Sequence, residues 1–108
     1  GRYEAADKYI RKTRKLVGKK FKLGLTSFPY VDYHLSLPYS VFLGRKGAKF
    51  NLPQIYWKAI GDSVRDSYER TYVWNRPYGR KIYPIGQTYM DVTKSELRSF
   101  RRHAGDPR

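Results

Sequence analysis

The chain has 108 residues, 40% of them hydrophobic and 17% aromatic, and its 23 Lys and Arg against 9 Asp and Glu give a net charge of +14. This length predicts one small domain, residues 1–108, and the aromatic content excludes a wholly disordered tail. The absence of Cys excludes disulfides and thiolate chemistry. No stretch approaches the roughly 18 apolar residues of a membrane-spanning helix, so we expect no integral membrane segment.

The first segment, residues 1–22, is predicted to be a basic helical arm. Apolar and small side chains recur at helical spacing from Tyr3 to Val17, and Gly18 follows as the expected stop. The arm contains nine cations and only two acids. Because solvated faces usually mix the two signs, we expect this face to lie along a polyanion, with an anionic membrane surface as the alternative.

Residues 23–92 are predicted to form the core, which begins with β structure. Apolar and polar residues alternate over 31–37, and this pattern indicates a half-buried strand or extended segment. Residues 39–43 and 48–52 flank the sequence Gly-Arg-Lys-Gly at 44–47. This arrangement predicts a short β-hairpin whose loop carries two cations.

A long central helix is predicted next, ending near Asn75. Asn51 can cap it, Pro53 suits its first turn, and apolar residues recur at helical spacing over 57–72. The following run, residues 82–90, contains Pro and Gly and is predicted to be extended and irregular.

The last segment, residues 93–108, is predicted to form a short helix and a tail. Thr93 and Glu96 have the spacing of a capping box, the helix covers about 94–103, and Gly105 follows as its stop. Three helices around a small β element make the predicted fold class α+β.

Seventeen cations in three groups are the candidate RNA-binding residues. They lie on the N-terminal helix and its extension, on two glycine-containing loops, and on one face of the last helix, with His103 and Arg108 beside the third group. Exposed Tyr78 or Tyr83 would be able to stack on an unpaired base. The seventeen residues are Lys8, Arg11, Lys12, Arg14, Lys15, Lys19, Lys20, Lys22, Arg45, Lys46, Lys49, Arg76, Arg80, Lys81, Arg98, Arg101 and Arg102.

No arrangement in the sequence predicts an enzyme. Neither histidine has a metal-binding spacing, and the Gly-Arg-Lys-Gly segment lacks the spacing and the Lys-Ser/Thr ending of a P-loop. Three acids interleaved with arginines indicate an exposed salt-bridged helix face: Asp62, Asp66 and Glu69. We therefore expect a non-catalytic protein with no cofactor, no metal and no small-molecule substrate.

With its basic arms, modest core and irregular segments rich in Pro, Gly and Tyr, the chain resembles small ribosomal proteins, especially those of organelle ribosomes. The resemblance assigns no residue a role. It implies a structural constituent of a ribosome, mitochondrial rather than cytosolic, that binds rRNA phosphates and neighbouring protein subunits. The sequence begins without Met, for which a removed transit peptide is one explanation. The alternative is a peripheral accessory subunit of a mitochondrial inner-membrane respiratory or ATP-synthase complex.

Overall fold

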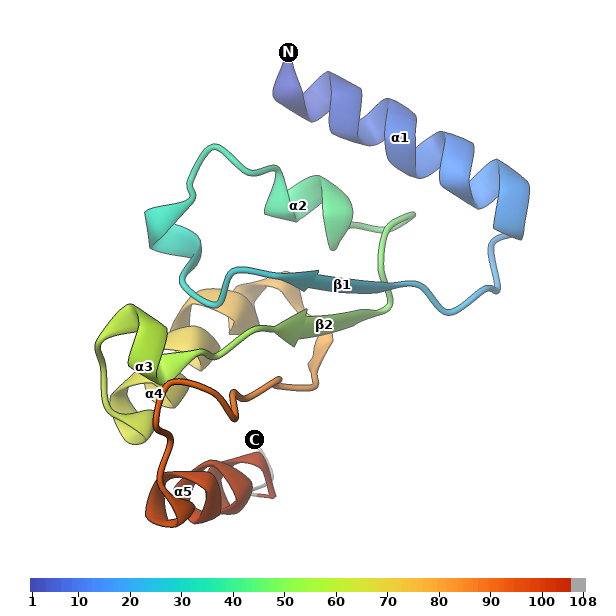
Figure 1. Ribbon diagram of the computed structural model, residues 1–108. Coiled ribbons are helices and arrows are strands. Elements are labelled where there is room, and N and C mark those ends of the chain that lie inside the picture. The colour runs from blue at the N-terminus through green and yellow to red at the C-terminus, as the bar shows by residue number, and fades with distance from the viewer. Residues whose placement is uncertain (106–108) are drawn as a thin grey trace.

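The structure, a computed structural model, describes residues 1–105, and within them the chain forms five helices and one three-stranded sheet (Figure 1). The α+β class predicted from the sequence is confirmed. The helices are α1 (Arg2–Val17), α2 (Tyr39–Phe42), α3 (Trp57–Ile60), α4 (Val64–Asn75) and α5 (Lys94–Ala104). The strands are β1 (Gly24–Ser27), β2 (Phe50–Pro53) and β3 (Lys81–Ile82), and Val31–Tyr33 and Arg76–Tyr78 form short 3-10 helices.

All three strands are parallel, in the order β1-β2-β3. Gly24 pairs with Phe50, and Phe50 pairs with Lys81, so the amino-terminal ends of the three strands lie side by side at one end of the sheet. Parallel neighbours require crossover connections. The first crossover contains α2, and the second contains α3 and α4.

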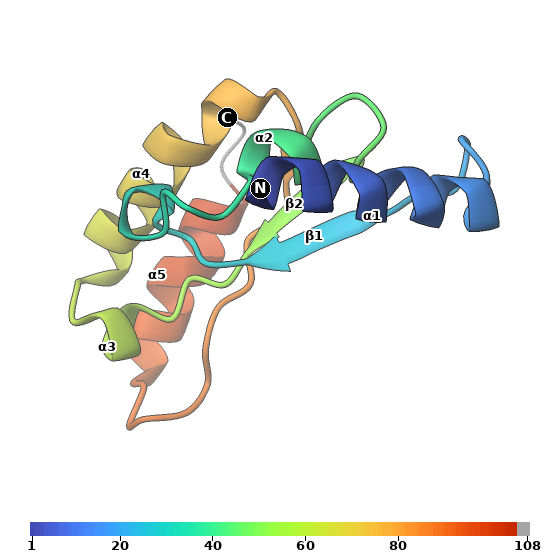
Figure 2. The ribbon, with the colours of Figure 1, turned by 90° about the horizontal axis from the view of Figure 1, so that it is seen from above.

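The helices lie in two groups around the sheet. Helix α4 lies behind the sheet in the view of Figure 1, and α5 packs against α4. Helix α1 packs against α2 and runs alongside β1, as the view from above also shows (Figure 2). The molecule is elongated, 44 × 27 × 24 Å, with α1 and α5 at opposite ends of Figure 1.

Two small hydrophobic clusters stabilise the fold. Val31, Tyr39, Leu43 and Ala48 form the first, between β1 and α2, and Ile55, Tyr68 and Tyr72 form the second, between β2 and α4. The buried side chain of Asn75 joins the elements around them. Its amide donates to the Pro29 carbonyl at 2.9 Å and accepts from Asn51 Nδ2 at 2.8 Å.

The two terminal helices agree with the sequence predictions. Helix α1 begins one residue earlier than predicted and ends at Val17, where Gly18 has a φ of 89°. Helix α5 has the predicted capping box, in which Glu96 N donates to Thr93 Oγ1 at 3.1 Å and Thr93 N donates to Glu96 Oε1 at 3.0 Å.

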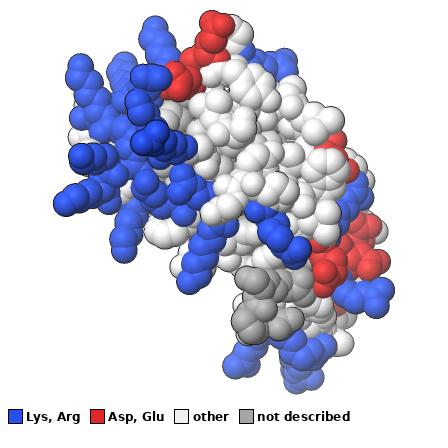
Figure 3. Space-filling model, turned by 180° about the vertical axis from the view of Figure 1, so that it is seen from behind, with Lys and Arg blue, Asp and Glu red and all other residues white. Residues whose placement is uncertain are grey.

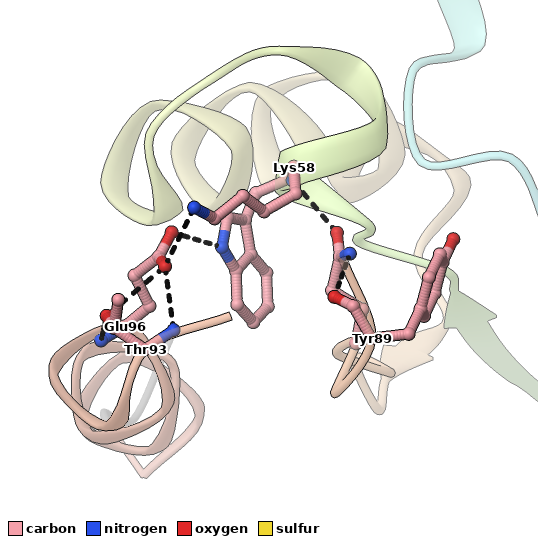
Figure 4. A network of polar contacts seen from close by, with 6 residues as sticks. Lys58, Tyr89, Thr93 and Glu96 are labelled. Atoms are coloured by element: carbon pink, nitrogen blue, oxygen red, sulfur yellow. Dashed lines mark hydrogen bonds and ion pairs between the residues drawn. The ribbon is translucent and has the colours of Figure 1, made fainter. Parts of the chain in front are cut away.

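Glu96 also fastens α5 to α3. Its carboxylate accepts a hydrogen bond from Trp57 Nε1 at 2.8 Å and forms an ion pair with Lys58 Nζ at 3.3 Å, and Figure 4 shows Lys58 and Glu96 pointing toward each other. The Thr93 backbone N–H, followed by Trp57 and Lys58, lowers the pKa of this carboxyl below its ordinary value. The cap of α5 is therefore also a polar link between α5 and α3.

The predicted hairpin is wrong, and residues 31–37, predicted to be a half-buried strand or an extended segment, form no strand. Residues 39–42 form a helix, and β2 pairs with β1 in parallel. A hydrogen bond from Lys49 N to the Leu23 carbonyl at 2.7 Å extends this pairing by one step. Tyr30 and Val31 are both buried, so burial does not alternate there as it would along a strand. Val31–Tyr33 instead form a 3-10 helix that contacts α4, and Tyr33 and Leu35 are exposed, so the alternation of residue types does not mark a buried face.

The central helix is shorter than predicted, although its predicted end at Asn75 is confirmed. Asn51 lies inside β2 and does not cap a helix. Gly61, with a φ of 89°, ends α3, and Ser63 caps α4 by accepting from Asp66 N at 3.0 Å. Asp62 consequently lies outside the helix, where it accepts a hydrogen bond from the Tyr30 hydroxyl.

The segment after β3 is largely irregular, as predicted. One isolated bridge pairs Ile85 with Gln54. Gln87 anchors the remainder, since its Oε1 accepts from Lys58 N at 2.8 Å and its Nε2 donates to the Tyr89 carbonyl at 3.1 Å (Figure 4).

Candidate nucleic-acid interface

Positive charge is concentrated at one end of the molecule. Figure 3 shows a dense group of Lys and Arg side chains on one side, with acids at its upper margin and on the opposite side. The sequence explains this distribution, because residues 8–49 contain eleven Lys and Arg and a single acid, Asp32. The crossover between β1 and β2 brings the two cationic parts of that stretch together.

A groove at this end is lined entirely by cations, and we call it the basic groove. Helix α1 supplies one wall, the turn after it supplies Lys19, and the loop of residues 44–49 supplies the other wall. The lining residues are Arg11, Arg14, Lys15, Lys19, Arg45, Lys46 and Lys49. The structure thus brings together members of two groups that the sequence analysis treated separately.

Arg14 holds the two walls of the basic groove together. Its guanidinium is buried, with the residue only 9% exposed, and it donates to four backbone carbonyls. Nε and Nη2 bond to Lys46 O at 2.8 Å and Gly47 O at 2.7 Å, while Nη1 bonds to Gly18 O and Phe21 O. We therefore assign Arg14 a structural role, and its planar fork of donors explains why an arginine stands there.

Two glycines allow the 44–49 loop to fold tightly. A Cβ on Gly47 would lie 2.1 Å from the Phe42 carbonyl oxygen, and one on Gly44 would lie 2.6 Å from the Ser40 carbonyl oxygen. Two backbone hydrogen bonds close the turn: Gly47 N donates to Gly44 O at 3.0 Å, and Ala48 N donates to Phe42 O at 2.7 Å. Arg45 and Lys46 consequently stand exposed at the tip of the loop.

Four cations of the N-terminal group are not among the residues that line the basic groove. Lys8, Lys12, Lys20 and Lys22 are exposed. Arg11 is partly engaged, since its Nε is 2.7 Å from Asp7 Oδ2.

The predicted turn at residues 76–81 lies against the same loop. Arg80 donates to Leu43 O at 3.0 Å and to Gly44 O at 2.6 Å, so it ties the segment before β3 to the start of the loop, much as Arg14 ties α1 to it. Arg76 and Lys81 are exposed. Tyr78 is half-buried against Tyr39, and burial raises its pKa, so of the two tyrosines considered for stacking only Tyr83 offers an open ring.

The third predicted group is separate from the basic groove. Arg98, Arg101 and Arg102 share one exposed face of α5, as their spacing predicts. This face lies at the other end of the molecule from α1 (Figure 1). His103 hydrogen-bonds the Ser99 carbonyl at 2.8 Å, and Arg108 lies outside the described residues.

Two features of this region are visible only in the structure. The first is a pair of apolar side chains between the cations, Leu16 and Phe21, which are 79% and 53% exposed. The parallel sheet also places Lys22, Lys49 and Lys81 near the amino ends of its three strands. Pairing order carries that information, and residue spacing does not.

Among residues 1–105, no helix combines the length and the apolar composition needed to cross a bilayer, and no cluster of His, Asp and Glu suits a metal ion. Comparison of the chain with protein-family models, with curated proteins and with solved structures found no match.

Proposed function

We propose that this chain is a non-catalytic RNA-binding subunit whose basic groove holds RNA phosphates. The observation that carries the proposal is the groove, which is lined by Lys and Arg from three segments whose backbones are joined by the buried Arg14. Cations on an ordered backbone lose less conformational entropy on binding than cations on a mobile tail. Such a surface suits a backbone of regularly spaced phosphates.

Salt dependence is the physical signature of this mode of binding. Besides Arg14, six cations line the basic groove. If each neutralised one phosphate of a duplex, the logarithm of the binding constant would fall with the logarithm of salt concentration with a slope of about −5. Phosphate contacts fix position and orientation and carry no base information, which is the property a scaffold subunit needs.

A pair of matched triple variants tests the groove against net charge alone. One variant has Lys15, Lys19 and Lys46 replaced by Ala, which removes three groove cations. The control variant has Arg2, Arg65 and Lys94 replaced by Ala, which removes three exposed cations elsewhere. Both variants change the net charge from +14 to +11, that is 14 − 3. The readout is fluorescence anisotropy with an RNA duplex of about 20 base pairs between about 50 and 200 mM KCl.

The groove variant should flatten the salt slope by about 2.7, and the control variant by less than about 1. Equal effects of the two triples would show that affinity follows total charge, and the basic groove would then lose its assigned role.

We further propose that the assembly is a ribosome, mitochondrial rather than cytosolic, in which the exposed tyrosines meet neighbouring proteins. The support is the large positive charge, which needs a counter-surface of phosphates, together with the eleven tyrosines. In a lysate of the native source, the chain should sediment with ribosomal particles and leave them after ribonuclease treatment. Sedimentation that ribonuclease does not alter would reject this assignment.

One observation favours a second candidate function, a peripheral subunit of a mitochondrial inner-membrane complex. Leu16 and Phe21 are exposed between cations, a combination that suits the interface of an anionic bilayer. Leu16→Ser with Phe21→Ser should then reduce binding to vesicles containing cardiolipin and leave RNA duplex binding unchanged. Detergent-dependent extraction of the native chain with a membrane complex would favour this candidate over the first.

A further inference from the structure

One face of the sheet is open. Gly24, Phe50 and Lys81 lie side by side on it, and Thr26 and Leu52 form the next row. Alternate residues of β2 point to the other face, where Asn51 and Pro53 are buried. On the open face Gly24, Thr26 and Lys81 are exposed, and Phe50 and Leu52 are half-buried.

The open face carries an aromatic pair with a lysine beside it. The rings of Phe50 and Tyr83 are 5.7 Å apart at an interplanar angle of 78°, and Lys81 Nζ is 5.2 Å from the centroid of the Tyr83 ring. Tyr83 is 43% exposed. Gly24 keeps the neighbouring position bare, since a Cβ there would lie 2.8 Å from Leu52 Cδ1.

The segments that form this face carry charge of one sign. The segments that contain the strands and the residues before them, 22–27, 49–54 and 80–85, include no Asp or Glu. Each segment begins with a cation, and one of these, Lys49, also lines the basic groove. The open face and the basic groove therefore meet at the end of the sheet where the three strands begin.

We propose that the open face binds unpaired bases of single-stranded RNA, with one base stacked on Tyr83 beside Phe50. Lys22, Lys49 and Lys81 would meet the phosphates on either side of that base. Base-aromatic stacking beside lysines is how sequence-tolerant single-strand platforms bind, because every base has a π face. The uniform positive charge selects a polyanion over an apolar protein partner.

This inference rests on the proposed function and specifies the form of the bound RNA. The RNA that leaves the basic groove is single-stranded where it crosses the open face of the sheet. The probes are a single-stranded RNA of about 12 nucleotides that carries one 2-aminopurine, a length within the site sizes of such platforms, and an RNA duplex of about the same length for comparison.

Tyr83→Leu removes the π face and keeps an apolar side chain. It should weaken binding of the single strand about tenfold, abolish the quenching of 2-aminopurine, and leave the duplex affinity unchanged. Tyr83→Phe should behave as the unaltered protein does. Tyr3→Leu is the control, because Tyr3 is 53% exposed on α1.

A measurement on the unaltered protein keeps the test independent of the folding of any variant. A single strand carrying 5-bromouridine should cross-link under ultraviolet light to Tyr83 or Phe50. Cross-links confined to other segments, or equal losses of single-strand and duplex affinity in Tyr83→Leu, would overturn the proposal and leave this face to a protein partner or a structural role. If instead the two triple variants flatten the salt slope equally, the proposed role of the basic groove is wrong. That result does not involve Tyr83, so the failure of the proposed function and the failure of this inference are distinguishable.

Discussion

Arg14 Nη2 donates a hydrogen bond to the carbonyl oxygen of Gly47 at 2.7 Å, which joins α1 to a loop 33 residues further along the chain. The same guanidinium bonds the carbonyl of Gly18 at the end of its own helix. One buried cation thus sets the distance between the walls of a groove whose other cations face solvent or lie half-buried. Stability and the geometry of the candidate site depend on the same side chain.

Replacing Arg14 with lysine should lower the free energy of unfolding by about 3 kcal/mol, because a single ammonium cannot span carbonyls on both walls and hydrogen bonds to a charged group contribute about 1.5–3 kcal/mol each. Urea denaturation measures the change. The matched control, Arg11→Lys on the exposed side of the same helix, should stay within about 0.5 kcal/mol of the unaltered protein. Equal stability of the two variants would contradict the structural role of Arg14.

Gly47→Ala should destabilise the chain by about 1–3 kcal/mol through overpacking, since the new Cβ would meet the Phe42 carbonyl oxygen at 2.1 Å. The displaced loop should also weaken duplex RNA binding. Gly61→Ala is the control: its φ of 89° makes alanine costly by about 1 kcal/mol, but its Cβ would meet nothing. Thermal melts and anisotropy together separate the two, and unchanged RNA binding by Gly47→Ala would sever the loop from the interface.

The buried amide of Asn75 should be worth about 2–4 kcal/mol. Asn75→Ala leaves the Pro29 carbonyl and the Asn51 amide without this partner inside the protein, and each orphaned buried group costs about 1–3 kcal/mol. Val73→Ala, at an exposed position of the same helix, is the control. A double-mutant cycle of Asn51→Ala with Asn75→Ala should show coupling, and strict additivity would contradict the contact.

The carboxyl of Glu96 should titrate below the ordinary glutamate value of about 4.3. A depressed folded-state pKa contributes stability above the unfolded pKa, and that stability is lost as the pH falls through the folded pKa. The Trp57 indole N–H resonance reports the event directly, because Nε1 donates to this carboxylate. Its midpoint should lie below about 4.3, and the transition should disappear in Glu96→Gln. A midpoint at or above that value would contradict the anchoring of α5.

The parts of the fold that could be predicted from the sequence are those that depend on residues close together in the chain. Gly18 stops α1, and Thr93 with Glu96 starts α5, because caps and stops act within a few residues. The prediction of a hairpin was wrong because β2 pairs with β1 and β3, which are distant from it in the sequence. Two glycines bounding a short basic segment look alike in a hairpin and in the turn that follows α2.

The candidate site divides along the same line. Exposed cations such as Lys15 and Lys46 could be named from composition, since charge excess is visible in the sequence. That Arg14 would be buried could not, because Arg11, Arg14 and Lys15 look equivalent until the 44–49 loop closes over one of them. The open face of the sheet was hidden for the same reason as the strand order.

The uneven placement of charge seen in Figure 3 has a kinetic consequence. Residues 1–49 contain twelve cations and three acids, a net +9, while residues 50–108 contain eleven and six, a net +5. A body charged in this way turns its more positive end toward a polyanion before contact, so that a larger fraction of diffusional encounters is productive. Association would be fastest in dilute salt and slow steeply as counterions screen the field, while dissociation would change less.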